Sequence, residues 1–290
     1  MATQGTAPSY FADSRRGEVG ELAAQLRNPD IQRDARKRRG VVQKVIACMT
    51  QGIDVAPLFS EMIMASATKD LVQKKLVYLY LRNYAESHSE LALLVINSLQ
   101  KDCSDDNPMI RGLALRNMCS LKINNLWDYV IDPLKVGVRD KNAYVRKAAA
   151  LGIVKLFYLF PTQVRDSNFS DTLYNMLQDR DAGVVANALF ALDELLAEEG
   201  GVVINTAIAE HLFRRLGDFD EWACSLVMGV LHRYTPANED AVFDILNILD
   251  ERLKHANSGV VLAAAKLFLD YTAVSCCFCA RTICTPPKTS

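Results

Sequence analysis

The pattern of hydrophobic and polar residues repeats along this chain at an interval of about 38 residues. Six segments carry apolar residues at relative positions 0, 4, 5 and 8, and position 0 is occupied by Val72, Ile110, Val145, Val184, Trp222 and Val260. On a helix that turns 100° per residue, these positions fall within an arc of ~140°. Each segment is therefore predicted to be an amphipathic helix with one buried face.

A second helix is predicted before each of these segments, so that the chain forms successive helix pairs. The predicted pairs are 56–66 with 68–85, 88–102 with 107–121, 124–138 with 142–160, 169–178 with 181–199, 206–216 with 219–234, and 238–254 with 257–273. A helix beginning near Gly17 and another over about 30–49 come first. This period predicts an all-α, right-handed α-solenoid of HEAT or armadillo-type helix pairs. Such a protein presents surface, so binding is expected rather than catalysis.

Several residues suggest how the helices begin and pack. Asp105, Asp140 and Asp179 each stand five residues before position 0, where a carboxylate can accept hydrogen bonds from exposed backbone amides. Pro133 lies inside a predicted helix and is expected to kink it. The small side chains of Ala149 and Ala188 are expected to be buried where helices approach closely.

Three parts are predicted along the chain: a flexible arm over 1–13, the helical repeat over 14–273, and a divergent tail over 274–290 that is expected to be disordered. The tail contains Cys276, Cys277, Cys279 and Cys284. This spacing could hold zinc or accept palmitoylation, and the alternative is an end without a dedicated role.

Composition narrows the function. The 33 basic and 34 acidic residues nearly balance, which argues against a nucleic-acid-coating protein. The first residues lack the pattern of a signal peptide, and no apolar run is long enough to span a membrane. The cysteines scattered through the helices fit a reducing, cytoplasmic location.

A catalytic or metal site is not evident. The four histidines are isolated, at His88, His211, His232 and His255, and no pair has metal-ligand spacing on one helix. Acidic pairs stand at helix ends, where capping explains them. We therefore expect no enzyme, no cofactor and no metal.

The most prominent local feature is a basic run made of Arg33, Arg36, Lys37, Arg38 and Arg39, with Arg27 and Lys44 nearby. Arg33 and Lys37 are expected one helical turn apart, as are Arg36 and Arg39. The run could be an ordinary solvated helix face. It could also contact anionic lipid headgroups, since each Lys or Arg near such a surface contributes about 1 kcal/mol.

Longer stretches resemble a known family, the beta-adaptins, which are large subunits of adaptor-protein complexes. The stretches are KKLVYLYLRNYA (74–85), KDCSDDNPMIRGLALR (101–116) and HANSGVVLA (255–263), and the resemblance covers roughly 8–272. Within the family, ASAT (65–68), EGGVVIN (199–205) and FDILNIL (243–249) are similar to the beta subunit of the fourth adaptor complex. Tyr10-Phe11, followed by Gly17-Glu18-Val19, instead resembles the start of the clathrin-associated beta subunits.

The resemblance implies a noncatalytic subunit of a heterotetramer in vesicle-mediated transport. Its implied partners are a second large subunit, a medium subunit, a small subunit, an Arf-family GTPase and a phosphoinositide membrane. The implied location is the cytoplasmic face of trans-Golgi or endosomal membranes. By the same resemblance, Arg33, Arg36, Lys37, Arg38, Arg39 and Lys44 are candidate phosphoinositide contacts, and Tyr10 and Phe11 are a candidate plug of the dileucine-signal site in the closed complex.

The sequence departs from the family after about Tyr271, and the long trunk, hinge and appendage of beta-adaptins do not follow. A truncated or alternative product is therefore expected, which could fail to assemble. Two other interpretations are a generic HEAT-repeat scaffold or transport receptor, and an enzyme built on a solenoid. The family-like stretches argue against the first, and the missing catalytic groups argue against the second.

Overall fold

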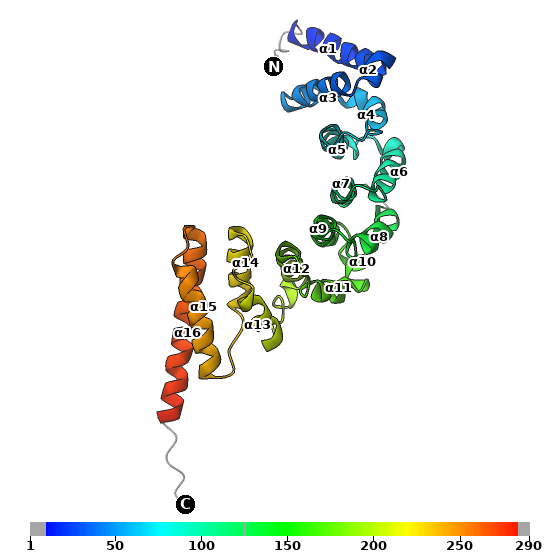
Figure 1. Cartoon of the computed structure of the whole chain (residues 1–290). Coiled ribbons are helices and arrows are strands. Elements are labelled where there is room, and N and C mark those ends of the chain that lie inside the picture. The colour runs from blue at the N-terminus through cyan, green and yellow to red at the C-terminus, as the bar shows by residue number, and fades with distance from the viewer. Residues whose placement is uncertain (1–9, 124–125, 284–290) are drawn as a thin grey trace, which may run out of the picture. The chain divides into compact units, whose positions relative to one another are not determined.

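The computed structural model describes the backbone of residues 10–123 and 126–283, and within these ranges the side chains of residues 10–16, 89, 92 and 274–283 lie outside the description. The described residues form helices and no strand (Figure 1). The α-helices are α1 (Tyr10–Arg27), α2 (Pro29–Arg33), α3 (Ala35–Thr50), α4 (Phe59–Ala65), α5 (Leu71–Tyr84), α6 (Ala92–Cys103), α7 (Pro108–Met118), α8 (Leu126–Gly137), α9 (Ala143–Leu159), α10 (Pro161–Asp166), α11 (Phe169–Met176), α12 (Ala182–Leu195), α13 (Thr206–Arg214), α14 (Glu221–Leu231), α15 (Glu239–Leu253) and α16 (Ser258–Ile283).

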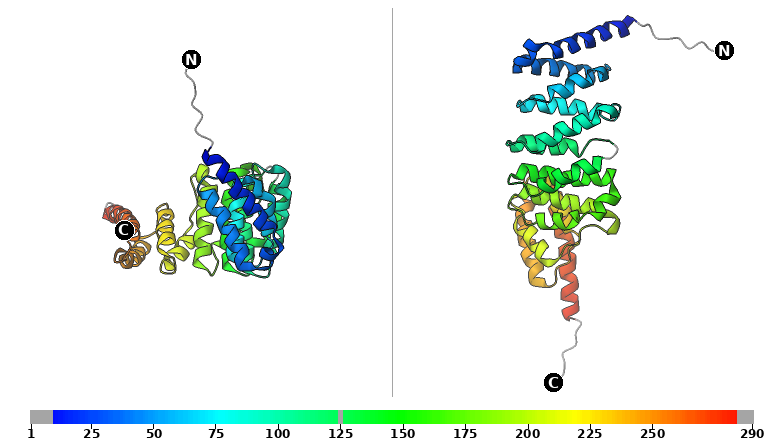
Figure 2. Two further views of the ribbon diagram at one scale, coloured as in Figure 1. Left: turned by 90° about the horizontal axis from the view of Figure 1, so that it is seen from above. Right: turned by 90° about the vertical axis from the view of Figure 1, so that its right-hand side faces the viewer.

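The chain divides into two compact units, residues 1–152 and residues 153–290. Each unit stacks its helices in two layers. In the first unit α3, α5 and α7 pack in one layer and α4, α6 and α8 in the other (Figure 2). In the second unit α12, α14 and α16 form one layer, and α13 packs against α15 in the other. The apolar core lies between the layers, so the predicted all-α solenoid is confirmed.

Apart from shifts of a few residues at several helix ends, the structure departs from the predicted helices in four places. α1 begins at Tyr10 rather than near Gly17, and α16 continues to Ile283 rather than ending at residue 273. The short helix α10 was not anticipated. The predicted helix over 30–49 is divided in two at Asp34, whose extended backbone ends α2 and whose side chain caps α3. Arg33 and Lys37 are therefore not one turn apart on a single helix.

A recurring turn precedes α7, α9 and α12. Asp105, Asp140 and Asp179 accept a hydrogen bond from the backbone N–H two residues later, at 2.8 to 2.9 Å. Those later residues, Asn107, Asn142 and Asp181, then accept from backbone amides of the helix itself. The acidic residues accept a backbone N–H, as expected, but that N–H belongs to the capping residue, and the acidic residues do not cap the helix themselves.

The predicted apolar column is displaced by one residue in two helices. Val72 of α5 and Trp222 of α14 are exposed, although their counterparts in the other four helices are buried. The N-caps explain the shift: Asp70 and Asp220 precede these residues by two positions, whereas Asn107 precedes Ile110 by three. The true equivalents are Gln73, which is fully buried, and Ala223.

The residue four positions after the cap ties neighbouring pairs together in the first unit. This residue is Lys74, Arg111 or Arg146, and in each case its nitrogen donates to carbonyl oxygens of the preceding turn at 2.9 to 3.1 Å. Two of them also reach the next pair: Lys74 binds Asp102 at 2.5 Å, and Arg111 binds Asp140 through two contacts of 2.9 Å. These links fix the spacing of successive pairs.

Pro133 lies inside α8, as expected, and leaves one backbone carbonyl of this helix without its usual donor. Proline has no N–H, so the carbonyl four residues earlier, on Tyr129, has no helical donor. The amide Nε2 of Gln100, on α6, donates to this carbonyl at 3.0 Å. A side chain of the neighbouring helix therefore replaces the missing backbone donor.

Candidate functional site

The basic run divides into a structural part and an exposed part. Arg38 is half-buried, and its guanidinium donates to Gln73 at 3.1 Å and to Thr68 at 2.8 Å. Arg39 is half-buried as well and forms an ion pair with Asp70 at 3.3 Å. Both arginines therefore hold α3 against the turn before α5. They are poorly placed to reach an external ligand.

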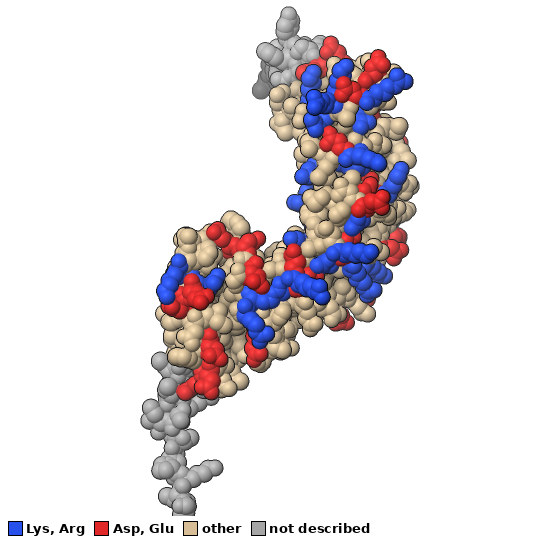
Figure 3. All heavy atoms as spheres, in the orientation of Figure 1, with Lys and Arg blue, Asp and Glu red and all other residues tan. Residues whose placement is uncertain are grey.

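The exposed part consists of Arg33, Arg36, Lys37 and Lys44. Asp34 lies among them, and hydrogen bonds from the backbone amides of Lys37 and Arg36 hold the pKa of its carboxyl below the ordinary value. Its nearest ion-pair contact is a loose one, 4.0 Å from Lys37. Figure 3 shows basic side chains gathered over α2 and α3 beside acidic ones. The exposed basic surface therefore has fewer members than the sequence predicted.

The remaining predicted sites fall on side chains outside the described residues. Tyr10 and Phe11 begin α1, but only their backbone is described. Cys276, Cys277 and Cys279 belong to the last part of α16, again by backbone alone, and Cys284 lies outside the described residues. The plug and the modification of the tail therefore stay predictions.

A surface that the sequence did not predict lies on the second unit. Trp222 of α14 is 86% exposed, and Leu262 and Leu269 of the adjacent helix α16 are 58% and 68% exposed. We call these three residues the apolar patch. The sequence assigned Trp222 to the core because its column was misplaced by one residue. The capping signal at Asp220 could have corrected the register.

Polar links beside the apolar patch join its two helices. His232, which directly follows α14, contacts Asp270 of α16, and Asn257, which directly precedes α16, donates to Glu221 of α14 at 2.5 Å. Tyr271 of α16 is buried and donates to the carbonyl of Leu231 at 2.9 Å. Because these contacts fix α14 against α16, the apolar patch is presented on a rigid support.

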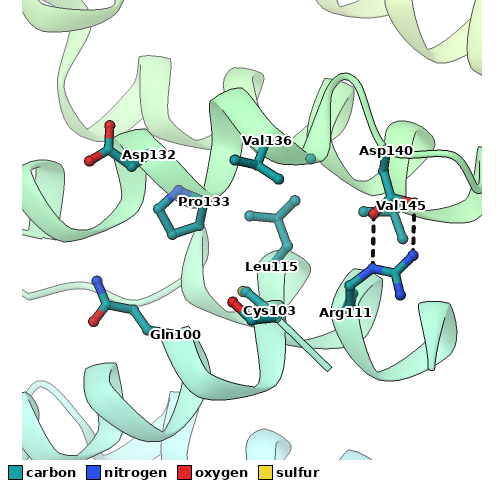
Figure 4. Close-up of a pocket in the computed structure, with 11 residues that line it drawn as sticks. Gln100, Cys103, Arg111, Leu115, Asp132, Pro133, Val136, Asp140 and Val145 are labelled. Atoms are coloured by element: carbon teal, nitrogen blue, oxygen red, sulfur yellow. Dashed lines mark hydrogen bonds and ion pairs between the residues drawn. The ribbon is translucent and has the colours of Figure 1, made fainter. Parts of the chain in front are cut away.

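A cavity of about 310 Å³ lies among α6, α7, α8 and the start of α9 (Figure 4). Figure 4 shows Cys103 and Leu115 facing Val136, with the ion pair of Arg111 and Asp140 at one side. Burial raises the pKa of the Cys103 thiol to about 12, so the sulfur stays protonated and unreactive near neutral pH. The cavity is lined mostly by apolar side chains and one ion pair, and its thiol is not an activated nucleophile.

No cluster of three or more histidine, cysteine or acidic side chains that could hold a metal occurs among the described residues. A search of the same part of the chain finds no helix that is long and apolar enough to cross a membrane.

Comparison with known proteins identifies the family. The profile of the Adaptin N terminal region matches residues 15–282. The AP-4 complex subunit beta-1 of Mus musculus is 51% identical over 251 residues, which cover 87% of this chain and 34% of that protein. The beta-adaptin-like protein A of Arabidopsis thaliana is 43% identical, over 91% of this chain and 33% of that protein. The AP-1 complex subunit beta-1 of Mus musculus is 37% identical, over 92% of this chain and 28% of that protein.

A structural relative agrees with the sequence relatives. A homology model of the full-length AP-3 complex in an intermediate open conformation has a TM-score of 0.61 at 25% identity, over 91% of this chain and 48% of that chain. The chain spans about a third of the length of the curated relatives it matches. Its identity is higher to an AP-4 beta subunit than to an AP-1 beta subunit, as the three stretches of the fourth-complex type had indicated. The chain therefore belongs to the beta-adaptin family and carries its N-terminal region.

Proposed function

We propose that this chain acts as a noncatalytic beta subunit of a heterotetrameric adaptor complex in vesicle-mediated protein transport. In this role it supports a second large subunit, a medium subunit and a small subunit, and it helps to bring the coat to cytoplasmic membranes for cargo sorting. Membership of the beta-adaptin family supports the proposal. The repeat fold supports it too, because a solenoid offers long surfaces and no enclosed active site.

The apolar patch is the observation that carries the proposal furthest. Trp222, Leu262 and Leu269 are all more than half exposed on helices that are rigidly joined. Large apolar side chains exposed on neighbouring helices are typical of sites of protein association, and tryptophan is enriched among residues that dominate binding energy. We assign the apolar patch to contact with another subunit of the complex.

A binding experiment with purified subunits tests this assignment. The double variant Trp222→Ser/Leu269→Ser should lose at least about tenfold in affinity for the medium and second large subunits, because two exposed anchors are removed. A matched control is Val203→Ser, which removes an exposed apolar side chain from a loop elsewhere in the same unit. Equal binding by the double variant and the wild type would contradict the assignment.

We also propose that Arg33, Arg36 and Lys37 contact phosphoinositide, with Lys44 as a peripheral member. Their exposure supports this, and salt should weaken the contact. Replacing Arg33, Arg36 and Lys37 by alanine should reduce flotation of the assembled complex with phosphoinositide liposomes. Replacing Arg38 and Arg39 should instead lower the melting temperature, because these two bind within the protein. Unchanged flotation of the triple variant would show that these residues do not bind the lipid and form an ordinary solvated helix face.

The finer parts of the family role are proposed on resemblance alone. They are recruitment to trans-Golgi or endosomal membranes by an Arf-family GTPase, and closure of the dileucine-signal site by Tyr10 and Phe11. Liposome recruitment that does not depend on the GTP-bound GTPase would refute the first. For the second, Tyr10→Ala/Phe11→Ala should tighten binding of a dileucine-signal peptide by the closed complex, and unchanged affinity would refute it.

A further inference from the structure

A groove lies between α13 and α15, which form one layer of the second unit. Unlike the apolar patch, it combines an apolar floor with a charged rim. It contains a cavity of about 270 Å³. The buried side chains of Phe213, Tyr234 and Ile245 form its floor, and the half-buried side chains of Ala241 and Ile248 form its wall. The floor is therefore apolar and can receive one bulky aliphatic or aromatic side chain.

The floor is held in place before any ligand arrives. The hydroxyl of Tyr271 donates to the backbone carbonyl of Tyr234 at 3.2 Å, and its ring contacts the Phe213 ring edge-on at 6.3 Å between centroids. The floor is thus attached to α16 beneath it. A preformed pocket costs less conformational entropy on binding than one that must be assembled.

The rim of the groove is acidic. Glu210 of α13 and Asp244 of α15 line the cavity and are exposed, and Asp240 stands one helical turn before Asp244. Within the described part of the chain, these three carboxylates form no ion pair. Arg214 is the one basic residue that lines the cavity. α15 itself carries five acidic residues and one basic residue, although the whole chain is nearly neutral. Figure 3 shows acidic side chains over α15.

We infer that the groove between α13 and α15 is a docking site for a basic segment of a partner protein, which inserts one bulky apolar side chain between flanking lysines or arginines. Charge complementarity selects this occupant, because unpaired carboxylates attract cations and repel acidic segments. The apolar floor supplies the anchor, which a purely ionic contact lacks. This site is separate from the basic run and from the apolar patch.

Peptide binding to the purified chain tests the inference. The probe is a fluorescein-labelled peptide of sequence Lys-Lys-Phe-Leu-Lys-Lys, followed by fluorescence anisotropy. Two comparison peptides replace the apolar pair by Ser-Ser or all lysines by glutamate. We expect the probe to bind, and each comparison peptide to bind at least about tenfold more weakly. Added salt should weaken binding of the probe.

Two variants locate the binding. Asp240→Lys/Asp244→Lys reverses the rim charge, and Ala241→Trp fills the cavity; each should reduce affinity for the probe about tenfold or more. The control Glu86→Lys/Glu90→Lys makes the same charge change on exposed residues of the first unit and should bind as the wild type does. Circular dichroism is used to check that each variant remains helical. The inference is overturned if the probe fails to bind at about 1 mM, if the Ser-Ser peptide binds equally well, or if the charge-reversal variant binds normally.

Discussion

At the scale of single residues, a side chain of α6 supplies a hydrogen bond that the backbone of α8 lacks. This contact joins the two neighbouring helices. Pro133 removes one N–H, and Gln100 of α6 supplies another to the carbonyl of Tyr129. A carbonyl left without a donor in a packed interface costs about 1–3 kcal/mol. The contribution of Gln100 to stability should therefore depend on the presence of Pro133.

A double-mutant cycle measures that dependence. Gln100→Ala should destabilise the chain by about 1 kcal/mol. In a Pro133→Ala background the backbone N–H of residue 133 can bind the Tyr129 carbonyl, so the same change should cost distinctly less. Urea unfolding of the four variants gives the coupling energy. Additive effects of the two substitutions would show that the contact contributes nothing.

Small residues set how closely two helices of the first unit can approach. Ala149 is fully buried, and its Cβ lies 3.4 Å from the place where a Cβ on Gly137 of α8 would stand. Ala149→Leu should therefore overpack the junction of α8 and α9 and destabilise the chain by roughly 1–3 kcal/mol. Thermal unfolding followed at 222 nm measures the change. An unaltered melting temperature would mean that the two helices can move apart without cost.

At the scale of elements, the apolar periodicity predicted helix pairs and their order, because burial of one face per helix dominates the pattern. It did not predict which residues face the core in every helix, because the apolar column is displaced by one residue in two of them. In α5 and α14 the exposed Val72 and Trp222 are apolar, so hydrophobicity alone cannot distinguish them from the core. The division at Asp34 was missed for a similar reason, since its neighbours are good helix formers and only its capping geometry ends α2.

The candidate site was less predictable than the helices. The basic run is visible as sequence, but the separation of Arg38 and Arg39 from Arg36 and Lys37 depends on partners about 30 residues away. The groove between α13 and α15 combines residues of three segments, and no local spacing reveals it. The apolar patch was hidden by the misplaced column. For the basic run and the groove the missing information is a long-range contact, whereas for the apolar patch it is the register set by the nearby cap Asp220.

The ion pair between Arg111 and Asp140 should make stability depend on pH. Burial opposes the charged form of Asp140, but hydrogen bonds from Arg111 and from the backbone of Asn142 outweigh it and hold the pKa of the carboxyl below the ordinary 3.8. A lowered pKa means that the stabilisation is complete above about pH 4 and is lost as the pH falls through the folded-state value.

The variant Asp140→Asn tests this pH dependence. At pH 7 it should be less stable than the wild type by about 1–3 kcal/mol, because Arg111 loses a charged acceptor. The difference should shrink when both proteins are unfolded by urea near pH 3. A difference that is constant between pH 7 and pH 3 would mean that the charge of Asp140 plays no part.

At the scale of the whole molecule, the chain presents several separate surfaces for contact with other molecules. The described residues offer an exposed basic surface, an apolar patch and an acidic groove, each on different helices. The chain belongs to the beta-adaptin family, and we propose that these surfaces contact a membrane, another subunit and a basic segment of a partner protein. We propose, as the central claim, that this chain binds the other large subunit and the medium subunit of an adaptor complex.

The most direct test is the molar mass of the co-purified assembly, measured by light scattering after size exclusion. The chain alone should elute at 32.2 kDa. Co-expressed with the second large and medium subunits of the fourth adaptor complex, it should elute in one peak whose mass equals the sum of one copy of each. A trunk fragment of the AP-4 complex subunit beta-1 of Mus musculus serves as the positive control. If that fragment assembles while this chain elutes alone at 32.2 kDa, the central claim is wrong.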